Sequence, residues 1–135
     1  AESIKNEACF RSPLGKEAKV NWVHCRDIGG VCAQALWLPD DHPLVIDRPV
    51  INVTGPSENT LGALEMASVL SESLGRSITY AEVTPPPYPG LEELWAFLKS
   101  GGFDACSESV EEITGKPPMT FREIVNEAKG QLTPD

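Results

Sequence analysis

His24 is the residue whose type and position point most directly to chemistry. An imidazole titrates near neutral pH, so His24 can both accept and donate a proton. It follows an apolar, β-rich run (Val20, Trp22, Val23), and open α/β sheets place their ligands at the carboxyl ends of strands. Asp27 could orient the imidazole. We therefore expect His24 and Asp27 to be catalytic; the alternatives are a structural histidine and, for Asp27, the cap of the following helix.

A second set of side chains is suited to binding a small molecule. Aromatic side chains bring a large contact area at a small entropic cost, and a guanidinium can hold an anionic group. We expect an apolar pocket for a planar metabolite, lined by Arg26, Tyr80, Tyr88, Trp95 and Phe103. The alternative is an ordinary core position for Trp95 and a solvated or ion-paired Arg26.

The cysteines and histidines lack the spacing of a metal site. Cys9, Cys25, Cys32 and Cys106 form no C-x-x-C pair, and the chain has only two histidines. Clustered ligands at short spacing are needed for zinc, so we expect no metal. Cys25 and Cys32 fall within an apolar pattern and are expected to be buried, reduced thiols, which favours a cytoplasmic protein.

Length and charge limit the partners. A chain of 135 residues is expected to form a single domain, residues 1–135. Its 20 acidic residues against 11 basic ones give a net charge of −9, which argues against nucleic acid and against anionic membrane surfaces. No apolar run is long enough for a membrane span, and no signal peptide is visible.

The hydrophobic periodicity predicts an α/β fold. Strands are expected at residues 19–25, 50–53 and 76–83, whereas residues 1–18 show little periodicity. Helices are expected between and after these strands, which gives the order β-α-β-α-β followed by helices. Strands joined through helices should be parallel, so the predicted fold is a small, partly parallel sheet with flanking helices.

Caps and glycines mark the ends of the predicted helices. The first helix should begin after Asp27, and the second after Thr60 with a stop at Gly75. A helix from residue 91 should end at Gly101 and Gly102, and a short one should close at Gly115. The last helix should begin with a capping box formed by Thr120 and Glu123 and end at Gly130.

Three stretches together resemble the C-terminal part of the NmrA-like atypical short-chain dehydrogenases, most of all the fungal reductases of the ergot-alkaloid type. They read "VNWVHCRDIGGVCAQAL", "INVTGPSENTLGALEMASVLSESLGRSITYAEV" and "EEITGKPPMTFREIV". The resemblance rests on the Arg26-Asp27-Ile28 junction, Thr54-Gly55-Pro56, Leu74-Gly75-Arg76 and the run from Thr114 to Phe121. It covers nearly the whole chain, although residues 84–106 look shortened.

This resemblance implies a Rossmann-type sheet and either NAD(P)H-dependent reduction of small molecules or redox sensing. However, no G-x-G-x-x-G turn follows a strand, and no Tyr-x-x-x-Lys pair exists, since Thr84 and Glu92 stand four residues after Tyr80 and Tyr88. His24 stands where the family commonly has an acidic residue. We therefore expect a truncated Rossmann-like fold that represents the substrate side and holds no cofactor.

Three functions follow as expectations. The first is a protein that binds a small apolar metabolite and acts as a cofactor-independent isomerase or cyclase. The second is a fragment of an NAD(P)H-dependent oxidoreductase that needs the absent half, and the third is a non-catalytic interaction module. Because a half-sheet exposes an edge and an apolar face, we also expect a homo-oligomer, most simply a dimer.

Overall fold

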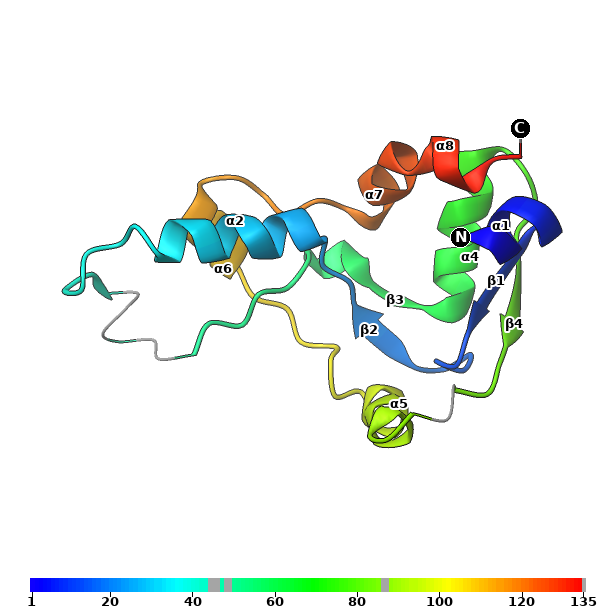
Figure 1. Cartoon of the computed structure of the whole chain (residues 1–135), viewed down its shortest axis with the longest axis horizontal. Helices are drawn as coiled ribbons and strands as arrows, with labels where there is room; N and C mark the ends of the chain where they lie inside the picture. Colours follow the sequence, from blue (N-terminus) through cyan, green and yellow to red (C-terminus); the bar gives the residue numbers. More distant parts are fainter. Residues whose placement is uncertain (44–46, 48–49, 86–87, 135) are drawn as a thin grey trace.

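The described part of the chain contains two small sheets of two strands each, with the β1–β4 pair toward one end of the molecule (Figure 1). The structure is a computed structural model and describes residues 1–43, 47, 50–85 and 88–134. In one sheet β1 (Cys9–Ser12) is parallel to β4 (Thr79–Glu82). In the other, β2 (Lys19–Asn21) is antiparallel to β3 (Thr60–Gly62).

Helices flank these sheets and make up most of the regular secondary structure. The chain passes through α1 (Glu2–Glu7), α2 (Cys25–Ala35), the 3-10 turn η1 (Ser57–Asn59), α4 (Ala63–Leu74), α5 (Leu91–Lys99), α6 (Ser109–Thr114), α7 (Phe121–Glu127) and α8 (Lys129–Leu132). Helix α2 extends with α6 to one side, whereas α1, α4, α7 and α8 gather around the β1–β4 sheet (Figure 1). The predicted α/β class with a small parallel sheet and flanking helices is confirmed.

The predicted order and direction of the strands are wrong in three respects. Residues 51–53 have no regular secondary structure and pair with no described strand. The strand expected at 19–25 ends at Asn21, and it pairs antiparallel with β3. Residues 1–18, read as poorly periodic, contain α1 and β1. Strand β1 escaped detection because its partner lies far along the chain, with Cys9 opposite Thr79.

Helix α2 is capped by a different residue from the one expected. His24 is the N-cap, and its Nδ1 accepts a hydrogen bond from the Arg26 amide at 3.2 Å. Asp27 is inside the first turn, and its Oδ2 accepts from the Met119 amide at 2.9 Å. The carboxylate therefore connects α2 to the segment before α7 instead of capping its own helix.

Other helix ends follow the predictions more closely. Gly75 (φ 66°) and Gly115 (φ 68°) adopt the left-handed conformation that ends α4 and α6. The capping box of Thr120 and Glu123 is confirmed at α7. The start of α4 was expected at Thr60 but lies after Gly62, because Thr60–Gly62 is occupied in pairing with β2. The last helix does not run on to Gly130, since α7 ends at Glu127 and Gly130 lies in α8.

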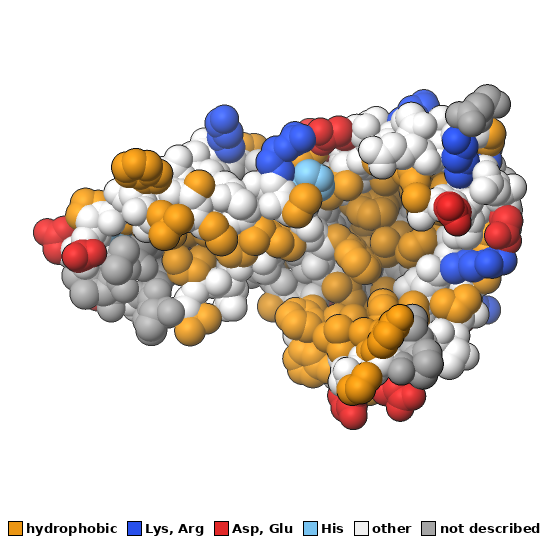
Figure 2. Space-filling model, viewed as in Figure 1, with side chains coloured by type: hydrophobic (Ala, Val, Ile, Leu, Met, Phe, Trp, Pro, Cys, Tyr) orange, Lys and Arg blue, Asp and Glu red, His pale blue; other side chains and the backbone are white. Residues whose placement is uncertain are grey.

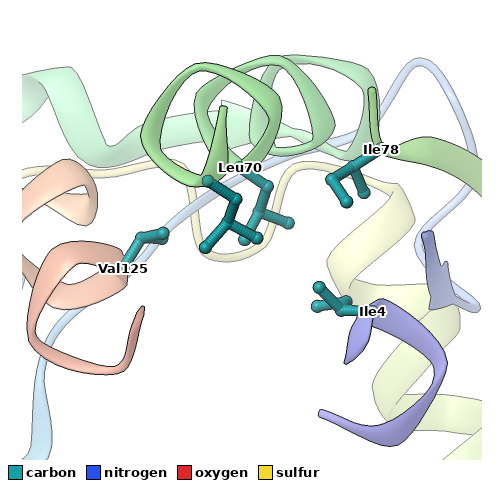
Figure 3. Packing of buried hydrophobic residues seen from close by; sticks show 5 residues of the cluster. Ile4, Leu70, Ile78 and Val125 are labelled. Carbon is teal, nitrogen blue, oxygen red and sulfur yellow. The ribbon is translucent and has the colours of Figure 1, made fainter. Parts of the chain in front are cut away.

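Two clusters of buried side chains form the core. The first joins α4 to both ends of the chain through Ile4, Leu70, Leu74, Ile78 and Val125 (Figure 3). The second lies beneath β2 and α5 and is centred on Leu14, Val20 and Ala63. Burial of these side chains supplies most of the favourable free energy of folding, about 1.5–3 kcal/mol for each large one.

The apolar face of α2 is largely uncovered. Val31 is buried, but Ile28 and Leu36 are exposed, and Leu36 retains 85% of its accessible surface. Cys25 and Cys32 are also exposed, so the prediction that they are core thiols is wrong. Helix α2 packs mainly on α6, and Arg26 and Asp27 connect its first turn to α7 and to the segment before α7. These contacts leave much of its apolar face in solvent.

Candidate functional site

A cleft of about 760 Å³ lies between β2, the segment at residues 51–54, and α5 with the turn that follows it. Most of its wall is apolar. Its lining residues are Val20, Asn21, Trp22, Val23, Ile51, Asn52, Val53, Thr54, Leu94, Trp95, Leu98, Gly102, Phe103 and Ala105. Figure 2 shows hydrophobic side chains gathered over α5 and the adjoining surface. A cleft of this size can hold a small organic molecule.

Asn21 holds the walls of the cleft together. Its backbone amide donates to the Phe103 carbonyl at 2.7 Å, and its Nδ2 donates to the Pro56 carbonyl at 3.1 Å. Its Oδ1 accepts from the Gly55 amide at 2.7 Å. Gly55 is required there, because a Cβ atom would stand 2.0 Å from the Trp22 carbonyl oxygen. One polar residue thus fixes the spacing of three otherwise apolar segments.

The floor of the cleft is aromatic. Trp22 and Trp95 pack against the core cluster of Leu14, Val20 and Ala63. The Nε1 atom of Trp95 is buried and has no hydrogen-bond partner among the described residues. Phe103 meets Phe97 edge to face, with ring centroids 5.2 Å apart. Such rigid rings offer contact area to a flat apolar molecule.

Only two of the five predicted binding residues, Trp95 and Phe103, line this cleft. Tyr88 is 69% exposed and borders a shallow hollow before α5. Arg26 is paired with Glu127, with Nη2 and Oε1 2.5 Å apart, on a different surface. The binding role of all five residues stays a prediction.

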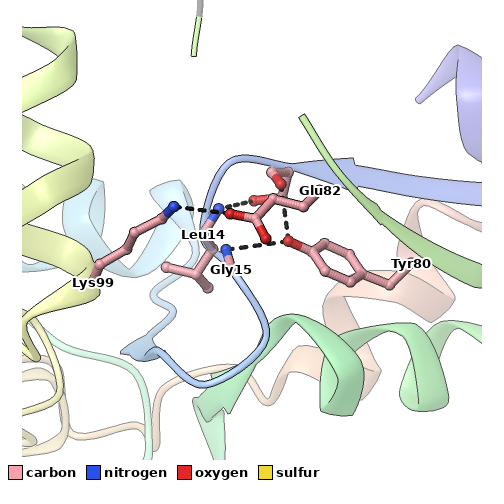
Figure 4. Close-up of polar contacts among 6 residues, drawn as sticks. Leu14, Gly15, Tyr80, Glu82 and Lys99 are labelled. Atoms are coloured by element: carbon pink, nitrogen blue, oxygen red, sulfur yellow. Dashed lines mark hydrogen bonds and ion pairs between the residues drawn. The ribbon is translucent and has the colours of Figure 1, made fainter. Parts of the chain in front are cut away.

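Tyr80 has a structural position that was not expected. Its hydroxyl donates to the Ser12 carbonyl at 3.0 Å and accepts from the Gly15 amide at 3.1 Å, as Figure 4 shows. Burial raises the pKa of this hydroxyl. The nearby Glu82 carboxylate is 2.9 Å from Lys99, which joins β4 to α5. Tyr80 therefore fastens the loop after β1 and does not line the cleft.

His24 and Asp27 do not lie in the cleft either. His24 borders a small hollow together with Glu127, and its Nδ1 is engaged in capping α2. Asp27 accepts from the Met119 amide and does not bond to His24. A general acid or base must reach its substrate, so the structure gives this pair no shared position in the apolar cleft. Their catalytic role stays a prediction.

Several residues of the site were missed by sequence reasoning. Trp22 and Asn21 were assigned to a strand only, and Leu94 and Leu98 to a helix face. A tryptophan next to an asparagine at the end of a strand was the available signal, because open α/β sheets place ligands there. No three described His, Cys, Asp or Glu residues come together in a group that could hold a metal ion. Within the described residues, no helix has the length and apolarity needed to cross a membrane.

The longer helices do not fit the diphosphate of a nicotinamide dinucleotide. A helix N-terminus binds phosphate through free backbone amides. His24 already accepts from an amide of α2, and Glu65 accepts from the Gly62 amide at the start of α4. The first turn of α5 carries Glu92 and Glu93, which repel an anion. The described residues by themselves do not form a site for this group.

Comparisons with known proteins support one family. No protein-family model matches the chain. The chain is 31% identical over 138 residues to an NAD(P)H azoreductase of Xenophilus azovorans, covering 92% of this chain and 46% of the azoreductase. It is 25% identical over 141 residues to festuclavine synthase I of Penicillium roqueforti (strain FM164), covering 93% of this chain and 46% of the synthase. The solved triphenylmethane reductase of Citrobacter sp. superposes with a TM-score of 0.72 at 15% identity, covering 96% of this chain and 47% of the reductase.

The class defined by the fold is a Rossmann-like α/β protein, as in the triphenylmethane reductase structure. The chain is similar to the C-terminal part of the NmrA-like atypical short-chain dehydrogenases. It spans a little under half the length of the curated relatives it matches. The identity to the bacterial azoreductase exceeds that to the fungal synthase, so the resemblance is not confined to the ergot-alkaloid branch.

Proposed function

We propose that this chain forms the substrate-binding half of an NAD(P)H-dependent reductase and binds a small, flat, largely apolar molecule in its cleft. The observation that carries this proposal is the cleft of about 760 Å³ with Trp22, Trp95 and Phe103 in its wall. The relatives are named as reductases of azo and triphenylmethane compounds, which are aromatic. The nucleotide that such a reaction needs would be held outside the described residues.

The residues of the cleft would act by binding and by excluding water. Flat rings stack on aromatic side chains, and burial of apolar surface contributes about 25 cal/mol per Å². A net charge of −9 attracts a cationic ligand over distances comparable to the Debye length. A cationic aromatic dye is therefore a suitable first probe, and a neutral azo dye separates stacking from charge.

A cofactor-independent isomerase or cyclase has less support. That expectation depended on His24 and on the aromatic side chains, and His24 caps α2 outside the cleft. Asp27, expected to orient His24, accepts from the Met119 amide instead. No specific observation favours a non-catalytic interaction module. The homodimer and the cytoplasmic location expected from the sequence stay predictions.

Tryptophan fluorescence provides a direct test. Trp22 and Trp95 line the cleft, whereas Trp37 is 86% exposed at the end of α2. In a Trp37→Phe background, a cationic triphenylmethane dye should quench the remaining emission in a saturable way. A Leu94→Lys change adds a charge to the cleft wall and should weaken binding about tenfold or more.

The matched control is Leu36→Lys, which makes the same change at an exposed position on α2. This variant should bind the dye as tightly as the Trp37→Phe parent. Added salt should weaken dye binding by the variant and by the parent equally. Absence of saturable quenching, or an equal loss in both lysine variants, would contradict a binding site in the cleft.

A further inference from the structure

A second pocket, of about 370 Å³, lies where the turn η1 and strand β3 meet α4 and the start of α7. Leu61, Val69 and Phe121 form its apolar wall, and all three are half-buried. Glu58 and Arg122 are its charged side chains. None of the residues that line this pocket lines the cleft, so the two cavities are separate. The function proposed above makes no use of the second pocket.

Most polar side chains of this pocket are already engaged. The amide group of Asn59 makes hydrogen bonds to three backbone groups, and the Thr120 hydroxyl belongs to the capping box of α7. Nη2 of Arg122 lies 2.6 Å from Oε2 of Glu72. By contrast, the Glu58 carboxylate makes no ion pair or hydrogen bond with another described residue. One negative charge at the edge of an apolar pocket therefore lacks a partner among the described residues.

Phe121 adds an aromatic ring to the apolar wall. The ring packs on one of the two core clusters, and this contact restrains it at the pocket. An ammonium group is attracted both to a carboxylate and to the face of an aromatic ring. Aliphatic side chains such as Leu61 and Val69 bind the apolar part of a ligand by removing it from water. This combination is suited to a small cation that carries an apolar body.

We propose that this pocket binds a small organic ammonium ion, whose charge lies beside Glu58 and whose apolar body lies against the aliphatic and aromatic wall. The net charge of −9 favours a cation over an anion. An anion would also find Arg122 already paired with Glu72. The volume lies within the usual range for small-molecule pockets, about 300–1,000 Å³. The proposal goes beyond the function proposed above, because it concerns a separate site.

A titration with phenethylammonium, followed by NMR of the backbone amides, tests the proposal. The amide resonances of Leu61 and Phe121 should shift in a saturable way, whereas those of Leu94 and Phe103 in the cleft should not. Phenethyl alcohol has the same shape without the charge and should bind at least about threefold more weakly, and the anion hydrocinnamate more weakly still. Equal affinities for the ammonium ion and the alcohol, shifts confined to the cleft, or no saturable shift would overturn the proposal.

Two glutamine variants separate the site from the overall charge. Glu58→Gln keeps the size of the side chain and removes its charge, so it should weaken phenethylammonium binding about threefold and leave the alcohol unchanged. The matched control is Glu111→Gln, which removes the same charge from an exposed position on α6, outside the pocket. The control should bind phenethylammonium as tightly as the unmodified chain. Equal losses in the two variants would overturn the proposal.

A third variant occludes the pocket. Val69→Phe places a larger side chain in the wall formed by α4 and should abolish the saturable shift of the Phe121 amide. Saturable binding that survives in the folded Val69→Phe chain would overturn the proposal. If this variant does not fold, the comparison of the two glutamine variants decides.

The neutral azo dye distinguishes this pocket from the cleft. Because the two cavities share no lining residue, a saturating concentration of the dye should leave the affinity for phenethylammonium unchanged. Displacement of phenethylammonium by the dye would place both in one site and overturn the proposal. A chain that binds phenethylammonium but no dye contradicts the proposed cleft ligand alone. A chain that binds the dye but not phenethylammonium contradicts the second site alone.

Discussion

Replacing Asn59 with alanine should remove a large part of the stability of this chain. Asn59 is fully buried at 0% exposure, and its side chain joins three segments. Its Nδ2 donates to the carbonyls of Trp22 at 2.7 Å and Met119 at 2.9 Å. Its Oδ1 accepts from the Phe121 amide at 2.6 Å. The end of β2, the turn η1 and the start of α7 are therefore held by one amide group.

The magnitude follows from the groups that alanine would leave without partners. Two carbonyls and one amide lose their hydrogen bonds, and each unsatisfied buried group costs about 1–3 kcal/mol. Trp22, Met119 and Phe121 are all half-buried, so water can satisfy part of this loss. We expect the free energy of unfolding to fall by about 2–3 kcal/mol, against a total of about 5–15 kcal/mol for a typical domain.

Urea unfolding followed by far-ultraviolet circular dichroism measures this loss. The matched control is Asn52→Ala, because Asn52 is exposed and its side chain makes no hydrogen bond with described residues. That variant should stay within about 0.5 kcal/mol of the unmodified chain. A loss below about 1 kcal/mol for Asn59→Ala, or equal losses in the two variants, would refute the role assigned to Asn59.

Two further predictions concern single side chains. Hydrogen bonds from the Gly62 amide and then from Lys19 lower the pKa of Glu65 below its ordinary value of 4.5. The ionised Glu65 therefore stabilises the folded chain above pH 4.5, and this contribution is lost as the pH falls through the lower pKa of the folded state. The urea midpoints of the unmodified chain and Glu65→Gln should therefore converge as the pH falls from about 6 to 3; divergence would count against this linkage. Tyr80→Phe should lower stability by about 1–2 kcal/mol, because two backbone groups of the loop after β1 lose their partner. Tyr88→Phe, at an exposed position, should leave the urea midpoint unchanged, and identical midpoints for both variants would be the contrary result.

Features decided by neighbouring residues could be predicted from the sequence. The stops at Gly75 and Gly115 require a left-handed backbone conformation that glycine adopts easily, and both were identified. The capping box of Thr120 and Glu123 involves residues three positions apart and was also identified. The aromatic content of the cleft was found through Trp95 and Phe103, because large rings on an apolar helix and turn are recognisable locally.

Features that depend on residues far away in the sequence could not be predicted. The pairing of β1 with β4 joins residues 70 positions apart in number, Cys9 with Thr79, and β1 alone has no distinguishing pattern. Asp27 is a good cap by type, but its carboxylate is taken by the Met119 amide far along the chain. The segment at 51–53 has the composition of a strand, yet no described strand lies beside it. Its residues favour a β-strand, but a strand forms only where a second strand pairs with it.

Arg76 makes hydrogen bonds to both the first and the last helix of the described chain. Its guanidinium donates to the carbonyls of Ile4 and Lys5 in α1 and to the carbonyl of Leu132 in α8, the last at 2.9 Å. Figure 1 places both termini on the same side of the molecule. A short linker could therefore join the ends into a circular permutant, opened at an exposed site such as the loop after α2. An affinity tag at either end would lie close to Arg76. A bulky tag at one end can therefore disturb the hydrogen bonds that Arg76 makes to both ends of the chain.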